Sequence, residues 1–281
     1  MILIVESGST KADWILADPR GVQLSFTSKG WNLGLLKESE MNSRVPKLSQ
    51  LIPFANKILE IHFYAPGVAL EASVICFKKV LENTFKNAII HIESDMLAAA
   101  RSVYKQTPLF VSILGTGSNT AFYDGKVLLQ NTPSLGYILG DEGSGSCLGK
   151  ELLKAYLYKT LPNDLYLSFS KLHAISKEKA LESTYILPNP NRFFAAYVPF
   201  LVAHRNHLFI ESLIKIQFES YIKTHLLSNR SIHDYSVAFV GSVAFLFQDL
   251  IRSLCTKHQI KVSSFCQYPL NGLCNYHLIL P

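Results

Sequence analysis

ILIVESGSTKADWILADPRG, the stretch Ile2–Gly21, has a counterpart in FVSILGTGSNTAFYDG, the stretch Phe110–Gly125, about 109 residues later. In this comparison Gly8 corresponds to Gly117, and each glycine lies between an apolar run and a second β-rich run. A pattern that recurs once over such a distance indicates a repeated structural unit. The sequence therefore predicts two matching half-domains.

Each of the two loops is predicted to be the tip of a β-hairpin, because the run after it ends in turn-forming residues, at 18–21 and at 124–125. Small residues let the backbone approach a ligand, and closely spaced hydroxyl and N–H donors can surround a phosphate. Neither loop matches the patterns of the usual mononucleotide and dinucleotide folds. Either loop alone could be an ordinary tight turn. The matched pair favours two loops that hold one polyphosphate from both sides.

Composition limits the class of protein. With 281 residues, 48% of them hydrophobic and 17% charged, the chain is long enough for two domains with buried cores. A net charge of +6 without a long basic run gives no indication of a nucleic-acid or membrane partner. The five cysteines include no C-x-x-C pair, which argues against a disulfide framework, a zinc finger or an iron–sulfur cluster. Without a signal peptide or an 18-residue apolar run, we expect a soluble, cytoplasmic protein.

The first half has the element order βββαβαβ. Hydrophobic spacing predicts a three-stranded meander over 1–28, a helix-compatible stretch at 35–50, a strand at 58–65, a helix at 70–85 and a strand at 87–92. This order implies a mixed sheet, in which crossover-connected parallel strands extend three antiparallel ones and helices lie outside.

The second half restarts the meander after a helix predicted at Asp95–Tyr104, for which Ser94 is the expected N-cap. The boundary is expected near residues 105–110, which gives an N-terminal lobe at 1–107 and a C-terminal lobe at 108–281 with inserted helices. The later elements are predicted as helices at 142–161 and 193–227, a strand at 236–240, a helix from 241 to 257 and an edge strand at 261–265.

Three segments carry a resemblance to a known family: ESGSTK at 6–11, GTGSN at 115–119 and GYILGDEGS at 136–144, followed by a late FVGS at 239–242. In this order and spacing they resemble the sugar kinase, hsp70 and actin superfamily. Within it, the chain is similar to the N-acetylglucosamine kinase group, which is grouped with the ATPases that activate benzoyl-CoA reductase. The resemblance covers nearly the whole chain. It implies an α/β fold of two ribonuclease H-like (actin-like ATPase) lobes, each a mixed sheet flanked by helices, with a cleft between them.

The resemblance also implies a nucleotide site for ATP and Mg²⁺. Glu6 would hold the hydrated Mg²⁺, a cation that needs few carboxylates; the alternative is a surface carboxylate at a strand end. The residues expected to bind the phosphates are Ser9, Thr10 and Lys11 in the first loop and Thr116 and Gly117 in the second, with Gly241 and Ser242 near the adenosine.

For the chemistry, the resemblance indicates Asp95 as the catalytic base that accepts the proton of the sugar 6-hydroxyl. The alternative for Asp95 is a second capping residue at the helix start. The residues expected around the sugar are Asn32, Asp95, Ser118, Asn119, Gly136 and Asp141. Asp141 and Glu142 could instead cap the helix after Gly140.

The function that follows is ATP-dependent phosphorylation of an amino sugar, with N-acetylglucosamine at its 6-hydroxyl as the first candidate. Residues 133–135 replace an aromatic residue that these kinases often carry before the GDEG segment, so the identity of the sugar stays open. The alternatives are an ATPase that couples nucleotide state to a partner protein and a non-catalytic sugar or nucleotide sensor. The aromatic side chains of 193–200 could seal a homodimer or pack in the core.

Overall fold

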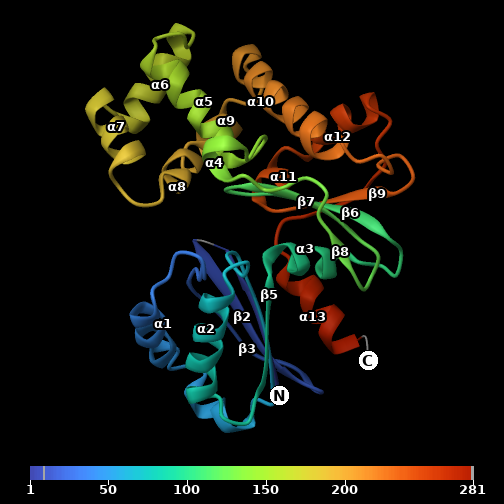
Figure 1. The fold of residues 1–281 in the computed structure, drawn as a ribbon. Helices are drawn as coiled ribbons and strands as arrows, with labels where there is room; N and C mark the ends of the chain where they lie inside the picture. Colours follow the sequence, from blue (N-terminus) through green and yellow to red (C-terminus); the bar gives the residue numbers. More distant parts are fainter. Residues whose placement is uncertain (9, 280–281) are drawn as a thin grey trace. The chain divides into compact units, whose positions relative to one another are not determined.

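The computed structural model describes residues 1–8 and 10–279 and divides into two compact units (Figure 1). Unit 1 comprises Met1–Tyr104 and Pro269–Pro281, and unit 2 comprises Lys105–Tyr268. Each unit contains one five-stranded mixed sheet with helices packed on it. The predicted α/β class, with one such sheet in each half of the chain, is confirmed.

The sheet of unit 1 has the strand order β3-β2-β1-β4-β5. The strands are β1 Ile2–Ser7, β2 Lys11–Asp18, β3 Gly21–Lys29, β4 Glu60–Ala65 and β5 Ile89–Ser94. The first three pair antiparallel, whereas β1, β4 and β5 pair parallel. This is the predicted arrangement, and it places the carboxyl ends of β1, β4 and β5 at one edge of the sheet.

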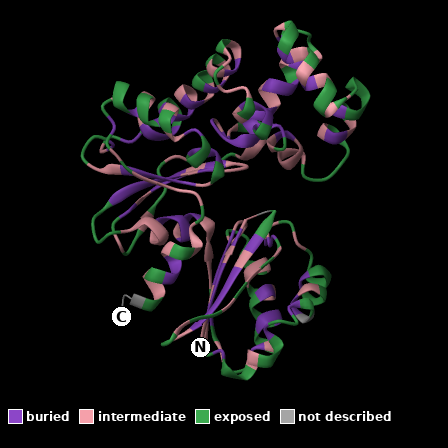
Figure 2. Ribbon diagram, turned by 180° about the vertical axis from the view of Figure 1, so that it is seen from behind, coloured by how far each residue is buried: buried purple, intermediate pink, exposed green. Residues whose placement is uncertain are grey.

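One face of this sheet carries an aromatic core. The rings of Trp14, Trp31, Phe63 and Phe77 are fully buried, with neighbouring centroids 4.8 Å to 6.3 Å apart. Figure 2 shows buried residues along the central strands and exposed ones on the outer sides of the helices. The helices of unit 1 are α1 Glu38–Arg44, η1 Val45–Lys47, η2 Ile52–Lys57, α2 Glu71–Thr84, α3 Asp95–Val103 and α13 Leu270–Ile279.

The last helix, α13, belongs to unit 1, although the sequence analysis assigned all residues after 107 to the second lobe. It packs against α3, as Figure 1 shows, and it also contacts the strands β1 and β2. Leu273 and Cys274 are buried in a cluster with Ile4, Ile15 and Tyr64. The C-terminal helix α13 belongs to unit 1 because it covers the second apolar face of that unit's sheet. The helix α3 alone does not cover this face.

The sheet of unit 2 has the order β10-β9-β6-β7-β8, with β10 at the edge as predicted. Its strands are β6 Leu109–Leu114, β7 Ser118–Tyr123, β8 Leu128–Leu129, β9 Ser236–Val240 and β10 Val262–Cys266. The β6–β7 hairpin repeats the β1–β2 hairpin, and β9 pairs parallel with β6 as β4 does with β1. The predicted duplication is therefore present in the strand topology of the two sheets.

The inserted helices of unit 2 are shorter than their sequence ranges. The region 193–227 is divided, since Pro199 lies in the first turn of a new helix, where proline is favoured. The helices are α4 Gly136–Leu139, α5 Gly145–Leu157, α6 Asn163–His173, α7 Lys177–Tyr185, α8 Pro190–Ala195, α9 Val198–Ala203, α10 Leu208–Tyr221, the π-helix η3 Ile222–Leu226, α11 Ser242–Leu246 and α12 Gln248–Lys257.

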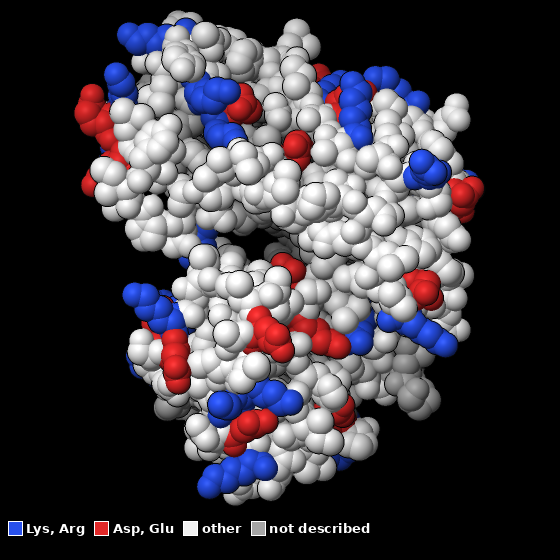
Figure 3. Space-filling view, viewed as in Figure 1, with Lys and Arg blue, Asp and Glu red and all other residues white. Residues whose placement is uncertain are grey.

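The aromatic residues of 193–200 lie in the core of unit 2. Phe194, Tyr197 and Phe200 are at most 5% exposed, and Phe193 packs against the same cluster. The core interpretation is thus confirmed. Acidic and basic side chains are interspersed on the face that Figure 3 shows. Among the described residues, no helix combines the length and apolar character needed to cross a membrane.

The docking of α13 can be tested through the two tryptophans, Trp14 and Trp31, which both lie in unit 1. We expect Leu273→Ala to lower the stability of unit 1 by about 2–5 kcal/mol, because it leaves a cavity between α13 and the sheet. Urea unfolding followed by tryptophan fluorescence measures this loss. The control is Asn275→Ala, at an exposed position of the same helix. Equal midpoints for the two variants would contradict the packing of α13 on unit 1.

Candidate active site

In unit 1, the parallel strands bring two of the predicted residues to one edge of the sheet. Glu6 of β1 is in register with Tyr64 of β4, and Ala65 is in register with Ser94 of β5. Asp95 follows directly as the first residue of α3. Because parallel strands end at the same edge, loops that follow different strands meet there. Glu6 and Asp95 therefore share this edge.

The first loop is a closed hairpin tip. The Gly8 N–H donates to the carbonyl of Lys11 at 2.9 Å, and the Gly30 N–H donates to the carbonyl of Thr10 at 3.0 Å. Thr10 and Lys11 are exposed, and Ser9 lies outside the described residues. The tip therefore presents a hydroxyl and an ammonium group to solvent, beside the edge that carries Glu6.

The position of Asn32 near the first loop is fixed by a hydrogen bond of the preceding residue, Trp31. The Trp31 N–H donates to the buried Ser7 Oγ at 2.7 Å, which fixes the chain after β3 against the end of β1. The Asn32 Oδ1 accepts from the Gly34 N–H at 3.1 Å. Asn32 thus lies at the edge where β1 ends.

Three carboxylates of unit 1 interact electrostatically. Glu6 faces Asp13 across the hairpin, and Asp13 forms an ion pair of 2.8 Å with Lys11. Burial, together with the charges of Asp13 and Asp95, raises the pKa of Glu6 to about 7, and the Lys11 charge opposes this shift. Close carboxylates that repel each other are oxygen ligands suited to a hard cation such as Mg²⁺. Glu6 and Asp13 therefore fit the predicted metal.

Ser94 is the N-cap of α3, as predicted, and Asp95 also binds an amide of the first turn, as the alternative of a second capping residue expects. The Ser94 Oγ accepts from the Leu97 N–H at 3.1 Å, whereas the carboxylate of Asp95 accepts from the Met96 N–H at 2.8 Å. Burial raises the pKa of Asp95, and the Met96 hydrogen bond partly offsets this effect. Asp95 is thus a carboxylate with a raised proton affinity, the property required of a general base.

In unit 2, three segments converge on the carboxyl ends of β6 and β9. Ile113 and Val240 are register partners, so the chain leaves both strands at the same edge. A side chain at Gly241, whose φ is +113°, would place Cβ 2.5 Å from the Leu114 carbonyl oxygen. Only glycine allows this approach at this φ. The turn after β9 therefore lies directly on the turn after β6.

The second loop, residues 115–117, is held by the first turn of α5. The Gly145 N–H donates to the Gly115 carbonyl at 2.8 Å, and the Ser146 N–H donates to the Thr116 carbonyl at 3.0 Å. These bonds satisfy amides that a helix N-terminus otherwise leaves without partners. Two carbonyls of the loop are thus bound by the first turn of α5. A Cβ at Gly115 would meet nothing within 4 Å, which leaves space for a ligand there.

Asp141 closes the same site. Its Oδ1 accepts from the Ser118 N–H at 3.1 Å, and a Cβ at Gly117 would lie 3.0 Å from its Oδ2. Burial raises the pKa of Asp141, with the Glu142 charge acting in the same direction and the Ser118 hydrogen bond opposing it. The Ser118 Oγ is buried without a hydrogen-bond partner in the described part of the chain. Gly117, Ser118 and Asp141 therefore form one contiguous group.

The capping alternative for Asp141 and Glu142 is wrong. Ser144 is the N-cap of α5, since its Oγ accepts from the Cys147 N–H at 3.2 Å. The Glu142 carboxylate instead lies 3.0 Å from Nε2 of His225, a buried residue of the π-helix η3. Sequence reasoning missed His225, because nothing local links it to a segment 83 residues away.

The remaining predicted residues lie around this group. The Asn119 Oδ1 accepts from Gln130 Nε2 at 2.7 Å and from the Thr120 N–H at 2.8 Å. Gly136 begins α4, and its carbonyl accepts from the Gly140 N–H at 2.8 Å, one helical turn before Asp141. Ser242 is exposed at the start of α11. Each lies on an element that adjoins the converging segments.

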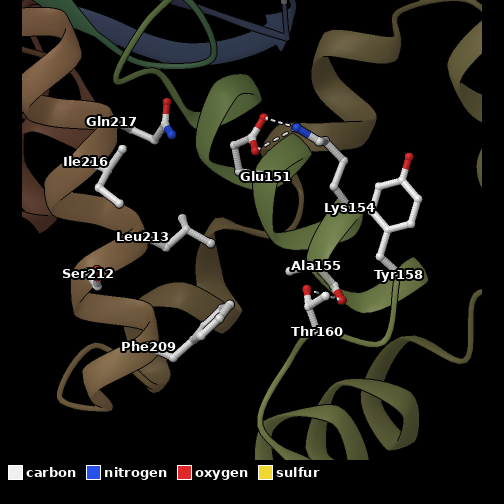
Figure 4. A pocket seen from close by; sticks show the side chains of 10 residues that line it. All are labelled: Glu151, Lys154, Ala155, Tyr158, Thr160, Phe209, Ser212, Leu213, Ile216 and Gln217. Atoms are coloured by element: carbon white, nitrogen blue, oxygen red, sulfur yellow. Dashed lines mark hydrogen bonds and ion pairs between the residues drawn. The ribbon is translucent and has the colours of Figure 1, made fainter.

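A separate pocket of about 390 Å³ lies between α5 and α10 (Figure 4). Its polar groups include Glu151 and Lys154, which form an ion pair of 2.9 Å, and Gln217 on the facing helix. None of the predicted site residues lines it. The pocket is therefore distinct from the converging loops.

Comparison with known proteins gave matches among solved structures, whereas no protein-family model and no curated protein matched. The chain is similar to a protein of Porphyromonas gingivalis proposed to be an N-acetylglucosamine kinase, with a TM-score of 0.93, 32% identity, and 100% of this chain and 99% of that chain covered. A protein of Chromobacterium violaceum, also proposed to be an N-acetylglucosamine kinase, has a TM-score of 0.74, 15% identity and 98% of each chain covered. ROK hexokinase of Thermus thermophilus has a TM-score of 0.56, 13% identity, and 99% and 100% covered. The last two similarities concern the fold alone.

The contact between the two turns of unit 2 can be tested at Gly241. We expect Gly241→Ala to destabilise unit 2 by about 2–4 kcal/mol, because a Cβ there is strained by the positive φ and clashes with the Leu114 carbonyl. Hydrogen exchange of the β6 and β9 amides measures the loss. The matched control is Gly115→Ala, for which we expect a change within about 0.5 kcal/mol. Unchanged protection in Gly241→Ala would show that the two turns are not packed as described.

Proposed function

Because the chain belongs to the N-acetylglucosamine kinase-like family of the sugar kinase, hsp70 and actin superfamily, we propose that it transfers the γ-phosphoryl group of ATP to an amino sugar. N-Acetylglucosamine is the proposed acceptor and its 6-hydroxyl the proposed position. Family membership rests on 32% identity over the whole chain, and the enzyme class, a sugar kinase, follows from it. The observation that supports the chemistry is the carboxylate of Asp95 at the strand edge shared with Glu6.

Asp95 is the proposed general base. Phosphoryl transfer requires alignment of the reactants, charge stabilisation and a group that accepts the proton of the attacking hydroxyl. Burial raises the pKa of Asp95, so its proton affinity moves closer to that of a working base near neutral pH. The Met96 N–H holds one of its oxygens at 2.8 Å and thereby fixes the orientation of the carboxylate.

The two hairpin loops are the proposed phosphate-binding segments. In unit 1, Thr10 and Lys11 are exposed at the first tip, with Ser9 between Gly8 and Thr10 in the sequence. In unit 2, Thr116 and Gly117 belong to a loop whose backbone is fixed by α5. We propose that both tips act on the phosphates of one ATP and that Gly241 and Ser242 lie near its adenosine.

Glu6 is the proposed Mg²⁺ residue, with Asp13 as its neighbour across the hairpin. Bound Mg²⁺ would offset the negative charge of the phosphate oxygens. It would also favour the charged form of Glu6, whose pKa is raised by burial and by the charges of Asp13 and Asp95. Lys11, paired with Asp13 at 2.8 Å, brings a further positive charge to the same tip.

The sugar is proposed to bind through residues at the strand ends of each unit. In unit 2, Asp141 accepts the Ser118 N–H with Oδ1, which leaves Oδ2 able to accept a sugar hydroxyl. The other proposed sugar-binding residues of unit 2 are Ser118, Asn119 and Gly136. In unit 1, Asn32 and Asp95 provide the other contacts. Paired donors and acceptors of this kind select a hydroxyl-rich ligand, because a ligand without them leaves buried polar groups unpaired.

The test of this function is Mg²⁺-dependent ADP release measured with N-acetylglucosamine, glucosamine, N-acetylmannosamine, N-acetylmuramic acid and glucose. We expect one amino sugar to raise the rate well above the rate without sugar. Asp95→Asn should keep ATP binding but lose at least about a hundredfold in kcat, the scale of a lost general base. The control is Asp164→Asn, an exposed aspartate in the first turn of α6. ATP binding without any response to a sugar would favour a partner-coupled ATPase or a sensor.

Asp141 provides a second, independent test. Asparagine tolerates the φ of +60° and can still accept the Ser118 N–H, so Asp141→Asn should fold normally. We expect kcat/KM for the sugar to fall about ten- to hundredfold, since a charged hydrogen-bond acceptor is lost. The KM for ATP should stay within about twofold of the unmodified protein. An equal fall in kcat/KM for the sugar and for ATP would contradict a role of Asp141 in sugar binding. An unchanged kcat/KM for the sugar would contradict it as well.

A further inference from the structure

Three histidines and a glutamate gather on the face of the unit 1 sheet that α13 covers. Glu60 and His62 lie on β4, His91 lies on β5, and His277 lies on α13. The rings of His62 and His91 are stacked with centroids 4.8 Å apart, and the ring of His277 lies 3.8 Å from that of His62. No part of the proposed kinase chemistry uses these residues.

The strand register sets the positions of the three strand residues. His62 and His91 are direct partners in the parallel β4–β5 pair, and Glu60 is two residues before His62, on the same face. Their separation is therefore determined by the sheet, and sites built on strands hold their side chains more precisely than sites built on loops. The two strands are neighbours in the sheet order β3-β2-β1-β4-β5.

The distances among these side chains match those around a small cation. One carboxylate oxygen of Glu60, Oε1, lies 3.0 Å from His62 Nε2 and 3.4 Å from His91 Nε2. All three ligand atoms lie within 4.8 Å of one another. Ligands of tetrahedral zinc, at about 2.0–2.2 Å from the metal, are about 3.3 Å apart. Two of the three separations thus already have the required value.

We propose that Glu60, His62 and His91 form a Zn²⁺ site with an open fourth position. Two imidazole nitrogens and one carboxylate oxygen are a ligand set that zinc accepts, and a three-residue site leaves the fourth position to water. Glu60 and His91 are each 43% exposed in their side chains, so the ion can enter from solvent. This site is separate from the proposed Mg²⁺ site, because Glu60 begins β4 and lies four residues, about 13 Å along the strand, before Tyr64, the register partner of Glu6.

Zinc at this position would stabilise the docking of α13. The ring of His277 lies on that of His62, and its Nε2 is 2.7 Å from the Tyr64 hydroxyl. An ion that fixes His62 fixes the surface on which α13 packs. The other ring nitrogen of His62, Nδ1, is buried without a hydrogen-bond partner among residues 1–8 and 10–279. Since ligating histidines normally donate from that nitrogen, we expect a lower affinity than that of closed four-ligand sites.

The test uses the full-length protein, stripped of metal and titrated with Zn²⁺ in a calorimeter. We expect one equivalent to bind and to shift the urea unfolding of unit 1, followed by tryptophan fluorescence, to higher concentration. His91→Ala and Glu60→Gln should each weaken binding at least about tenfold and lose this shift. Both positions are partly exposed, so these variants should fold. Co²⁺, used in place of Zn²⁺, should give the visible absorption of a four-coordinate ion.

The control is His233→Ala, an exposed histidine of unit 2, which should bind Zn²⁺ as the unmodified protein does. Equal affinity in the control and in both site variants would mean adventitious binding and would overturn the proposal, as would the absence of binding in the unmodified protein. Sugar phosphorylation does not depend on this site. A failed zinc test therefore leaves the proposed function standing.

Discussion

Parallel strand pairing is the constraint on which the candidate site depends. In unit 1, β1, β4 and β5 run parallel, and in unit 2, β6 and β9 do so. Parallel strands end at one edge, so loops that are distant in sequence meet without any direct attraction between them. Asp95 reaches the edge of Glu6 in this way, and Gly241 reaches the Leu114 carbonyl. Because Gly241 has no Cβ, the turn after β9 can pack directly on the turn after β6.

Local features of the site could be predicted from sequence because they depend on neighbours along the chain. A hairpin with its tip at residues 8–10 puts Glu6 opposite Asp13, although Asp13 was not singled out from that register. Ser94 could be identified as a cap because capping needs only a side-chain oxygen and an amide three residues later. The repeated loop likewise identified both hairpins.

Other features depend on contacts that no local pattern encodes. The apolar face of α13 does not specify which sheet it covers, and the structure assigns it to unit 1 through Leu273. His225 contacts Glu142 only because the π-helix η3 packs against the loop that carries Glu142. His62 and His91 come together only through the β4–β5 register. Glu142 and the three histidines carry titratable groups, so the missing information concerns chemistry as well as packing.

We propose different tasks for two carboxylates of one edge: Glu6, whose pKa is raised to about 7, binds the cation, and Asp95 accepts the proton of the sugar hydroxyl. The measurement that most directly tests phosphoryl transfer to the 6-hydroxyl, the step proposed for Asp95, is ³¹P NMR of the product formed from Mg²⁺, ATP and N-acetylglucosamine. We expect a phosphomonoester signal coupled to the two protons on carbon 6 of the sugar. Inorganic phosphate as the only new signal, or coupling to a single ring proton, would contradict the assignment of Asp95 to the 6-hydroxyl.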